Sequence, residues 1–143
     1  MSLINRLAAN TLCIGLTPAQ LLCIVREGAA FAAPTAHRHA VGNDENDWRP
    51  VLNALQVYLQ QADRPGRGLP VSVALSSRWC RLAMVPWSDA MLTEEGIARF
   101  LQSQYTALHG DGARDWVFAT DDAGYGQPRL ACGIERELLQ DLQ

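Results

Sequence analysis

The stretch VALSSRWCRLAMVPW, residues 73–87, decides the fold that we expect for this chain. It holds two apolar runs, one on each side of Ser76 and Ser77, and this pattern favours two strands joined with almost no turn between them. Serine hydroxyls at such a join can hydrogen-bond to the neighbouring backbone groups. We therefore expect the sheet to bend or to change strand partners at Ser76 and Ser77.

Three apolar runs earlier in the chain also predict strands. Thr11–Leu16 and Leu21–Arg26 are separated by the sequence TPAQ, which is typical of a tight turn. A third, alanine-rich run covers residues 29–41 and is interrupted by Pro34. Because proline has no backbone N–H, this strand should lie at an edge of the sheet or contain a bulge. The chain is thus expected to open with an antiparallel meander.

Two amphipathic helices are expected next. The first follows Asn46 or Asp47, either of which can cap it, and its apolar face consists of Trp48, Val51, Leu52, Leu55, Tyr58, Leu59 and Ala62. The second runs from Glu94 to Leu108 and should stop at Gly110. Strands at Trp116–Asp121 and Arg129–Cys132 and a helix at Glu135–Leu142 complete the order β-β-β-α-β-β-α-β-β-α. This order predicts an α/β fold with a mixed sheet and packed helices.

The composition of the chain excludes several classes of function. The 143 residues carry a formal charge of −3 with no dense basic patch, which argues against nucleic-acid binding. All 12 basic residues are arginines, so lysine-dependent phosphate loops and Schiff-base chemistry are excluded. No apolar run is long enough to span a bilayer, and no signal-peptide pattern is seen. We expect a cytoplasmic protein.

The cysteines and histidines predict no metal site. Cys13, Cys23, Cys80 and Cys132 include no C-x-x-C pair and are expected to be reduced apolar residues, although Cys13 and Cys23 could face each other across a hairpin. His37 and His39 share a strand face, but no third ligand is evident.

Two polar loops also resemble ligand sites only superficially. Residues 43–47, NDEND, lack the glycine and the final glutamate of a calcium loop. Gly124 and Gly126 follow Asp121 and Asp122, whose charges would repel phosphate, so a plain hairpin turn is expected there. No catalytic, cofactor or metal residue is predicted.

The order of elements and residues 73–87 together resemble a known family. A strand ending in Leu75-Ser76, then Arg81, then a second strand ending in Val85-Pro86 is similar to the ribonuclease-H-like half of actin-like ATPases, in the family of PilM and type II secretion protein L. The resemblance implies one ribonuclease-H-like domain over residues 1–143, the N-terminal half of a two-domain protein or a shortened relative.

The first hairpin departs from the ATPase pattern, in which an Asp holds magnesium and glycines approach phosphate. Gly15 and Thr17 are present in IGLTPAQL, but no Asp is, and Pro18 removes a backbone donor. The resemblance therefore implies a non-catalytic scaffold of a pilus or secretion platform, without cofactor, that binds an inner-membrane component or itself. A nucleotide-binding half of a larger ATPase and a toxin-neutralising immunity protein are the alternatives.

Arg81 and Trp87 are the candidate partner-binding residues. Nothing near Trp87 demands burial, because Pro86 precedes it and polar residues follow, so we expect this indole to be the most exposed of the four. Trp and Arg are enriched at the energetic centres of interfaces. Arg81 either faces solvent on a two-sided strand or meets a partner carboxylate on the same surface as Trp87.

Overall fold

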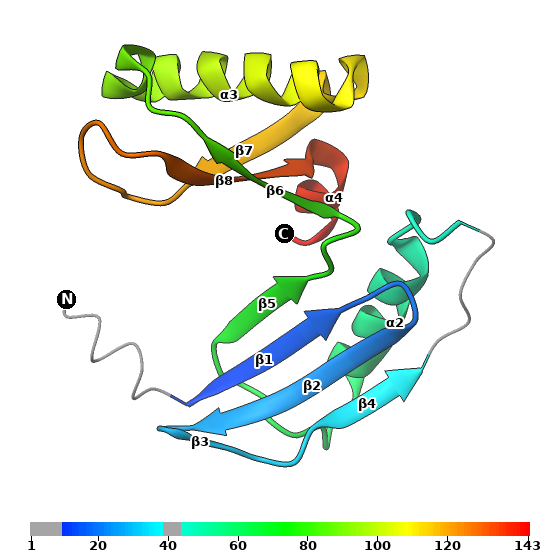
Figure 1. The fold of residues 1–143 in the computed structure, drawn as a ribbon. Helices are drawn as coiled ribbons and strands as arrows, with labels where there is room; N and C mark the ends of the chain where they lie inside the picture. Colours follow the sequence, from blue (N-terminus) through cyan, green and yellow to red (C-terminus); the bar gives the residue numbers. More distant parts are fainter. Residues whose placement is uncertain (1–9, 39–43) are drawn as a thin grey trace. The chain divides into compact units, whose positions relative to one another are not determined.

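The structure is a computed structural model that describes residues 10–38 and 44–143. The chain divides into two compact units, Met1–Arg78 and Trp79–Gln143, each of which is described by itself. Figure 1 traces the elements of each unit along the chain. The expectation that residues 1–143 form one ribonuclease-H-like domain stays a prediction.

The first unit contains a mixed five-stranded sheet with the order β3-β2-β1-β5, in which β4 also pairs with β2. Its strands are β1 (Thr11–Leu16), β2 (Gln20–Glu27), β3 (Ala30–Phe31), β4 (Thr35–Arg38) and β5 (Val71–Leu75). The hairpin β1-β2 is antiparallel, whereas β5 runs parallel to β1. This combination confirms the mixed sheet expected from the sequence.

The predicted third strand is split in two at residues 32–34. Both pieces, β3 and β4, pair with β2 along one side of the sheet in the part of the chain that the structure describes. Pro34 lies in the gap between them, where its missing N–H removes no ladder hydrogen bond. The edge position expected from Pro34 is confirmed.

Helix α2 (Arg49–Gln60) supplies the core of the first unit. Every second residue of β1 is buried, and the register places Leu16 opposite Leu21 and Ile14 opposite Cys23 on one face. Helix α2 lies against the sheet of the first unit (Figure 1). It contacts β2 and buries Val51 and Tyr58. The N-cap of α2 is Trp48, without a side-chain cap bond, so the expected cap at Asn46 or Asp47 is wrong; the Asp47 carboxylate, one residue earlier, accepts the Arg49 N–H at 3.1 Å.

The join at Ser76 and Ser77 is where the chain leaves one sheet for another. Strand β5 ends at Leu75 and belongs to the first unit, whereas β6 (Cys80–Val85) pairs with β8 in the second. The Ser76 hydroxyl accepts the Arg78 N–H at 3.2 Å, so it satisfies the backbone at the turn. The expected change of strand partners is confirmed.

The second unit contains an antiparallel sheet with the order β6-β8-β7. Its remaining elements are the 3-10 turns η1 (Asp89–Leu92) and η2 (Asp111–Asp115), helices α3 (Glu94–His109) and α4 (Arg136–Asp141), and strands β7 (Trp116–Thr120) and β8 (Arg129–Glu135). Thr93 caps α3 by accepting the Gly96 N–H, and Gly110, at φ 79°, ends the helix as expected.

Tyr105 is the central residue of the core between α3 and this sheet. It is fully buried, and its ring lies 4.9 Å from that of Phe118 and 6.1 Å from that of Trp116. A Cβ added to Gly133 of β8 would come within 3.0–3.1 Å of all three rings. The aromatic cluster therefore fits the sheet because β8 has no side chain at this position.

Candidate interaction surface

Trp87 lies just after β6 and is half-buried, packed against the core cluster of the second unit. Trp87 and Trp116 are both half-buried, whereas Trp48 and Trp79 are buried, so the expectation that Trp87 is the most exposed of the four stays a prediction. One side of the indole is held by the core. The partial exposure leaves part of the ring available for contact.

Two residues that the sequence analysis missed complete the surface around Trp87. The ring of Tyr125 lies 4.7 Å from the indole, tilted by 59°, and Tyr125 is 75% exposed. The Arg129 guanidinium carbon lies 5.6 Å from the indole centre, a cation–π contact. The Nε atom of Arg129 is buried and has no hydrogen-bond partner among the residues that the structure describes. We call Trp87, Tyr125 and Arg129 the aromatic–arginine cluster.

The β7-β8 hairpin carries Tyr125 into this cluster. The Asp121 carboxylate accepts the backbone N–H groups of Leu130 and Ala123, at 3.1 and 3.4 Å. Gly126 adopts φ 75°, which favours glycine, and the Gln127 N–H donates to the Gly124 carbonyl. The expected plain hairpin turn is confirmed, and its acidic residue braces the loop.

Arg81 occupies the opposite end of β6 from the cluster. It pairs with Gly133, whereas Val85, next to Pro86 and Trp87, pairs with Arg129. Val85 is four positions further along the strand than Arg81, a span of about 13 Å. Arg81 is half-buried, and its carbonyl accepts the Tyr105 hydroxyl. The arginine that contacts Trp87 is thus Arg129, and a partner-binding role for Arg81 stays a prediction.

The first hairpin uses its polar groups to close its own turn. The Thr17 hydroxyl donates to the Gln20 carbonyl at 3.1 Å and accepts the Gln20 N–H at 2.9 Å. The Thr17 N–H also donates to the Gln20 carbonyl, at 3.0 Å. Pro18 has no N–H, and the N–H groups of Thr17 and Gln20 are engaged in these bonds. Among residues 17–20, only the Ala19 N–H takes no part in them. Such a turn has little to offer a phosphate group.

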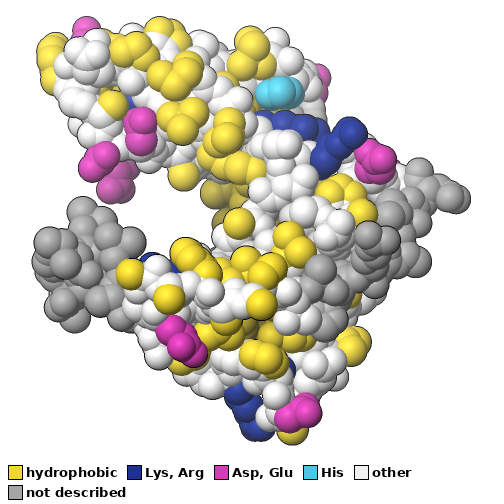
Figure 2. Space-filling view, turned by 60° about the horizontal axis from the view of Figure 1, so that its bottom comes forward, with side chains coloured by type: hydrophobic (Ala, Val, Ile, Leu, Met, Phe, Trp, Pro, Cys, Tyr) yellow, Lys and Arg dark blue, Asp and Glu magenta, His cyan; other side chains and the backbone are white. Residues whose placement is uncertain are grey.

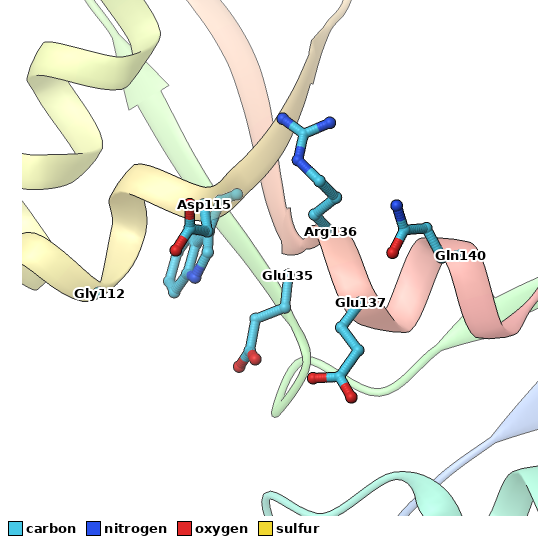
Figure 3. A pocket seen from close by; sticks show the side chains of 7 residues that line it. Gly112, Asp115, Glu135, Arg136, Glu137 and Gln140 are labelled. Atoms are coloured by element: carbon cyan, nitrogen blue, oxygen red, sulfur yellow. The ribbon is translucent and has the colours of Figure 1, made fainter.

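An open pocket in the second unit is acidic (Figure 3). Its volume is about 420 Å³, and it is lined by Gly112, Asp115, Trp116, Glu135, Arg136, Glu137 and Gln140. The carboxylates of Glu135 and Glu137 point the same way, while the Arg136 guanidinium points away from both (Figure 3). Three carboxylates against one arginine disfavour a phosphate ligand. Within residues 10–38 and 44–143, no three His, Cys, Asp or Glu side chains are grouped to hold a metal ion.

The remaining polar candidates lie in strand β4, in a local turn or outside the described residues. His37 belongs to β4 opposite Leu21, and His39 lies outside the described residues. Of residues 43–47, Asn43 is also outside, while the Asp44 carboxylate accepts the Asn46 N–H at 2.8 Å. This is a local turn bond of the kind expected for a solvated loop.

The strand register excludes the possibility that Cys13 and Cys23 face each other across the first hairpin. Cys13 lies opposite Ile24, and Cys23 lies opposite Ile14, so the two side chains point to opposite faces of the sheet. Cys23 is buried on the core face, where burial raises the pKa of its thiol. Cys13 and Cys23 therefore do not face each other, and all four cysteines are free thiols.

Several large apolar side chains remain exposed in each unit, and Figure 2 shows hydrophobic groups on the surface. In the second unit, Leu82, Met84 and Leu130 share one face of the sheet and are 63%, 65% and 43% exposed. In the first unit, Val71 and Val73 of β5 are 50% and 41% exposed. No helix of the described residues is long and apolar enough to cross a membrane.

Comparison with known proteins identifies the fold. No protein-family model matches the chain, and no curated protein sequence is significantly similar to it. Among solved structures, the cytoplasmic domain of EpsL, an inner membrane component of the type II secretion system of Vibrio cholerae, matches with a TM-score of 0.62 at 14% identity. That match covers 94% of this chain and 50% of EpsL.

Two other solved structures match over similar lengths. A Bacteroides thetaiotaomicron protein with an actin-like ATPase fold has a TM-score of 0.59 at 14% identity, over 99% of this chain and 51% of its own. The PilM-PilN type IV pilus biogenesis complex matches with 0.62 at 11% identity, over 94% and 43%. This chain spans about half the length of these structures. Its mixed sheet and packed helices have the actin-like fold, as the resemblance of residues 73–87 implied.

Proposed function

We propose that the protein is a non-catalytic interaction domain on the cytoplasmic side of a type IV pilus or type II secretion assembly platform. Two of the structures that share its fold are components of such assemblies, EpsL and the PilM-PilN complex. The aromatic–arginine cluster is the observation that carries the proposal for this chain. It supplies the three residue types that most often dominate binding energy at protein interfaces.

The construction of the cluster suits a binding anchor. Trp87 is held on one side by the core, so little conformational entropy is lost when a partner covers its other side. Tyr125 and Arg129 extend this rigid base with an exposed ring and a charged donor. An inner-membrane assembly component, or a second copy of the chain, would place an apolar side chain and a carboxylate here.

The first hairpin supports the non-catalytic role in this proposal. Its turn has no acidic residue to hold magnesium, and its hydroxyl is engaged by Gln20. The acidic pocket offers no better phosphate site. These features favour a scaffold over a nucleotide-hydrolysing enzyme.

Site-specific photo-cross-linking in the native host tests the proposal. A photoreactive phenylalanine analogue replaces Tyr125, and the cross-linked products are identified by mass spectrometry. We expect one dominant protein adduct that is lost when Arg129→Ala is added. The matched control places the analogue at Arg99, on the exposed surface of α3, and should not give this adduct. Equal adducts at both positions, or none at 125, would contradict the assignment.

The similarity to a solved protein with an actin-like ATPase fold favours one alternative, a nucleotide-binding half of a larger actin-like ATPase. Titration calorimetry with magnesium ATP separates the two functions. The scaffold predicts no heat of binding. A saturable signal that Thr17→Ala abolishes, with the fold retained, would favour the ATPase half.

A further inference from the structure

Cys80 and Cys132 lie on neighbouring strands of the second unit and on the same face of the sheet. Cys132 pairs directly with Leu82, and Cys80 is two residues before Leu82 on the same strand. Because side chains alternate along a strand, Cys80, Leu82 and Cys132 all point to one face. The two cysteines are therefore diagonal neighbours across β6 and β8.

The two thiols are close enough to interact. A hydrogen bond to Cys80, the charge of Cys80 and, above all, burial together raise the pKa of the Cys132 thiol to about 12. Both residues are half-buried, so neither is sealed from small solutes. Their sheet face also carries the exposed Leu82 and Met84, which leaves an approach from solvent within this unit.

We propose that Cys80 and Cys132 form a dithiol that peroxides oxidise to an intramolecular disulfide linking β6 to β8. Cα atoms of diagonal neighbours in an antiparallel pair are about 7–8 Å apart, with their Cβ atoms closer. A disulfide requires a Cα separation below about 7 Å, so closure needs a small local shift of the two strands. The resulting bond is strained and hence easily reduced, which makes the couple reversible.

The chemistry balances with one peroxide molecule. The Cys80 sulfur attacks a peroxide oxygen and becomes a sulfenic acid, and the O–O bond breaks to release water. The Cys132 sulfur then attacks the Cys80 sulfur, forming the S–S bond and expelling a second water. The two thiols lose two protons and two electrons, and hydrogen peroxide accepts them. The raised pKa of the Cys132 thiol disfavours its thiolate, so Cys80 is the sulfur that reacts with peroxide first, and Cys132 gives up its proton to the departing hydroxide of the sulfenic acid as the S–S bond forms.

The chain contains its own control in Cys13 and Cys23. These cysteines also lie on neighbouring strands, but the register directs them to opposite faces of the first sheet. In both pairs the cysteines lie on adjacent strands. The pairs differ in whether the two side chains point to the same face of the sheet. If the disulfide requires both side chains on the same face of the sheet, it should form between Cys80 and Cys132 and not between Cys13 and Cys23.

Peptide mapping of the wild-type chain tests this inference without any variant. The reduced protein is treated with hydrogen peroxide, the remaining thiols are alkylated, and the digest is examined by mass spectrometry. We expect the Cys80 and Cys132 peptides joined with the loss of two hydrogen atoms, and separated again by dithiothreitol. Single oxidised cysteines without this link, or an equal yield of a Cys13–Cys23 link, would overturn the proposal.

Variants then assign the two sulfurs. Cys132→Ser should abolish the link and allow the sulfenic acid on Cys80 to be trapped by dimedone, whereas Cys80→Ser should abolish both. Cys13→Ser combined with Cys23→Ser should leave the link unchanged. Retention of the intramolecular link in either of the first two variants would show that another pair of thiols forms it.

Discussion

The Tyr105 hydroxyl donates a 2.9 Å hydrogen bond to the backbone carbonyl of Arg81. Tyr105 lies on α3 and Arg81 on β6, 24 residues earlier, so this bond ties the helix to an edge strand of its sheet. The Tyr105 ring is fully buried, and desolvation raises the pKa of its hydroxyl above the ordinary value. The hydroxyl is therefore a neutral donor throughout the physiological pH range.

Removal of this hydroxyl should weaken the second unit. Tyr105→Phe keeps the ring packing and loses one partly buried hydrogen bond, so we expect a loss of about 1–2 kcal/mol in the free energy of unfolding. Tyr105→Leu, which also removes the ring contacts, should cost clearly more. Urea denaturation followed by tryptophan fluorescence measures both, and equal losses would mean that the hydroxyl contributes nothing.

Gly133 should tolerate no side chain. A Cβ there would lie 3.0–3.1 Å from the rings of Tyr105, Trp116 and Phe118, so Gly133→Ala forces the aromatic cluster to shift. We expect a destabilisation of about 1–3 kcal/mol from this overpacking. Gly124→Ala is the matched control, because an added Cβ meets nothing within 4 Å. Thermal unfolding of the two variants should differ, and similar melting temperatures would refute the overpacking.

Substitutions at Trp87 and Tyr125 should affect partner binding and folding stability to different extents. Tyr125→Ala removes an exposed ring and one aromatic contact, so it should cost at most about 1 kcal/mol of folding free energy. Trp87→Ala should cost more, because the indole packs on the core, yet less than the roughly 3–5 kcal/mol of an emptied core site.

Both substitutions should weaken binding of the cross-linked partner, and Trp87→Ala should do so by about 2 kcal/mol or more. Isothermal calorimetry with that partner gives the binding loss, and chemical denaturation gives the folding loss. If Trp87→Ala unfolds the domain, the main role of the indole is in the core, and its assignment to the binding surface would be wrong. Unchanged affinity in Tyr125→Ala would remove the hairpin from the interface.

Cys132 should react slowly with alkylating agents. The pKa of the Cys132 thiol, raised to about 12, lies well above pH 8, so much less of it is ionised there than of an ordinary thiol, and only the thiolate reacts. Because the raised pKa lies above the working pH, the rate should increase as pH rises. Cys80→Ala removes the hydrogen bond and charge that contribute to the shift, so iodoacetamide should label Cys132 faster in this variant. An unchanged rate would show that burial alone sets the pKa.

The sequence by itself determined most elements of secondary structure and the order in which they occur. Strand β1 and the start of α3 at Glu94 agree with the expected bounds, because period-two and period-3.6 apolar patterns report local geometry. Gly110 marked the end of α3, and Ser76 marked the join between two strands, because both residues act on the local backbone. The change of sheet at Ser76 and Ser77 followed from those patterns, whereas the actin-like fold was implied by the family resemblance of the element order and residues 73–87.

Only the tertiary structure decided which side chains meet. From the sequence, Arg81 was a candidate to share a surface with Trp87, and Cys13 and Cys23 could have faced each other across a hairpin. Strand register instead brings Arg129 to Trp87 and Cys132 to Cys80. The physical reason is that a shift of one residue in register turns a side chain to the other face of a sheet, and register depends on pairing partners far away in sequence.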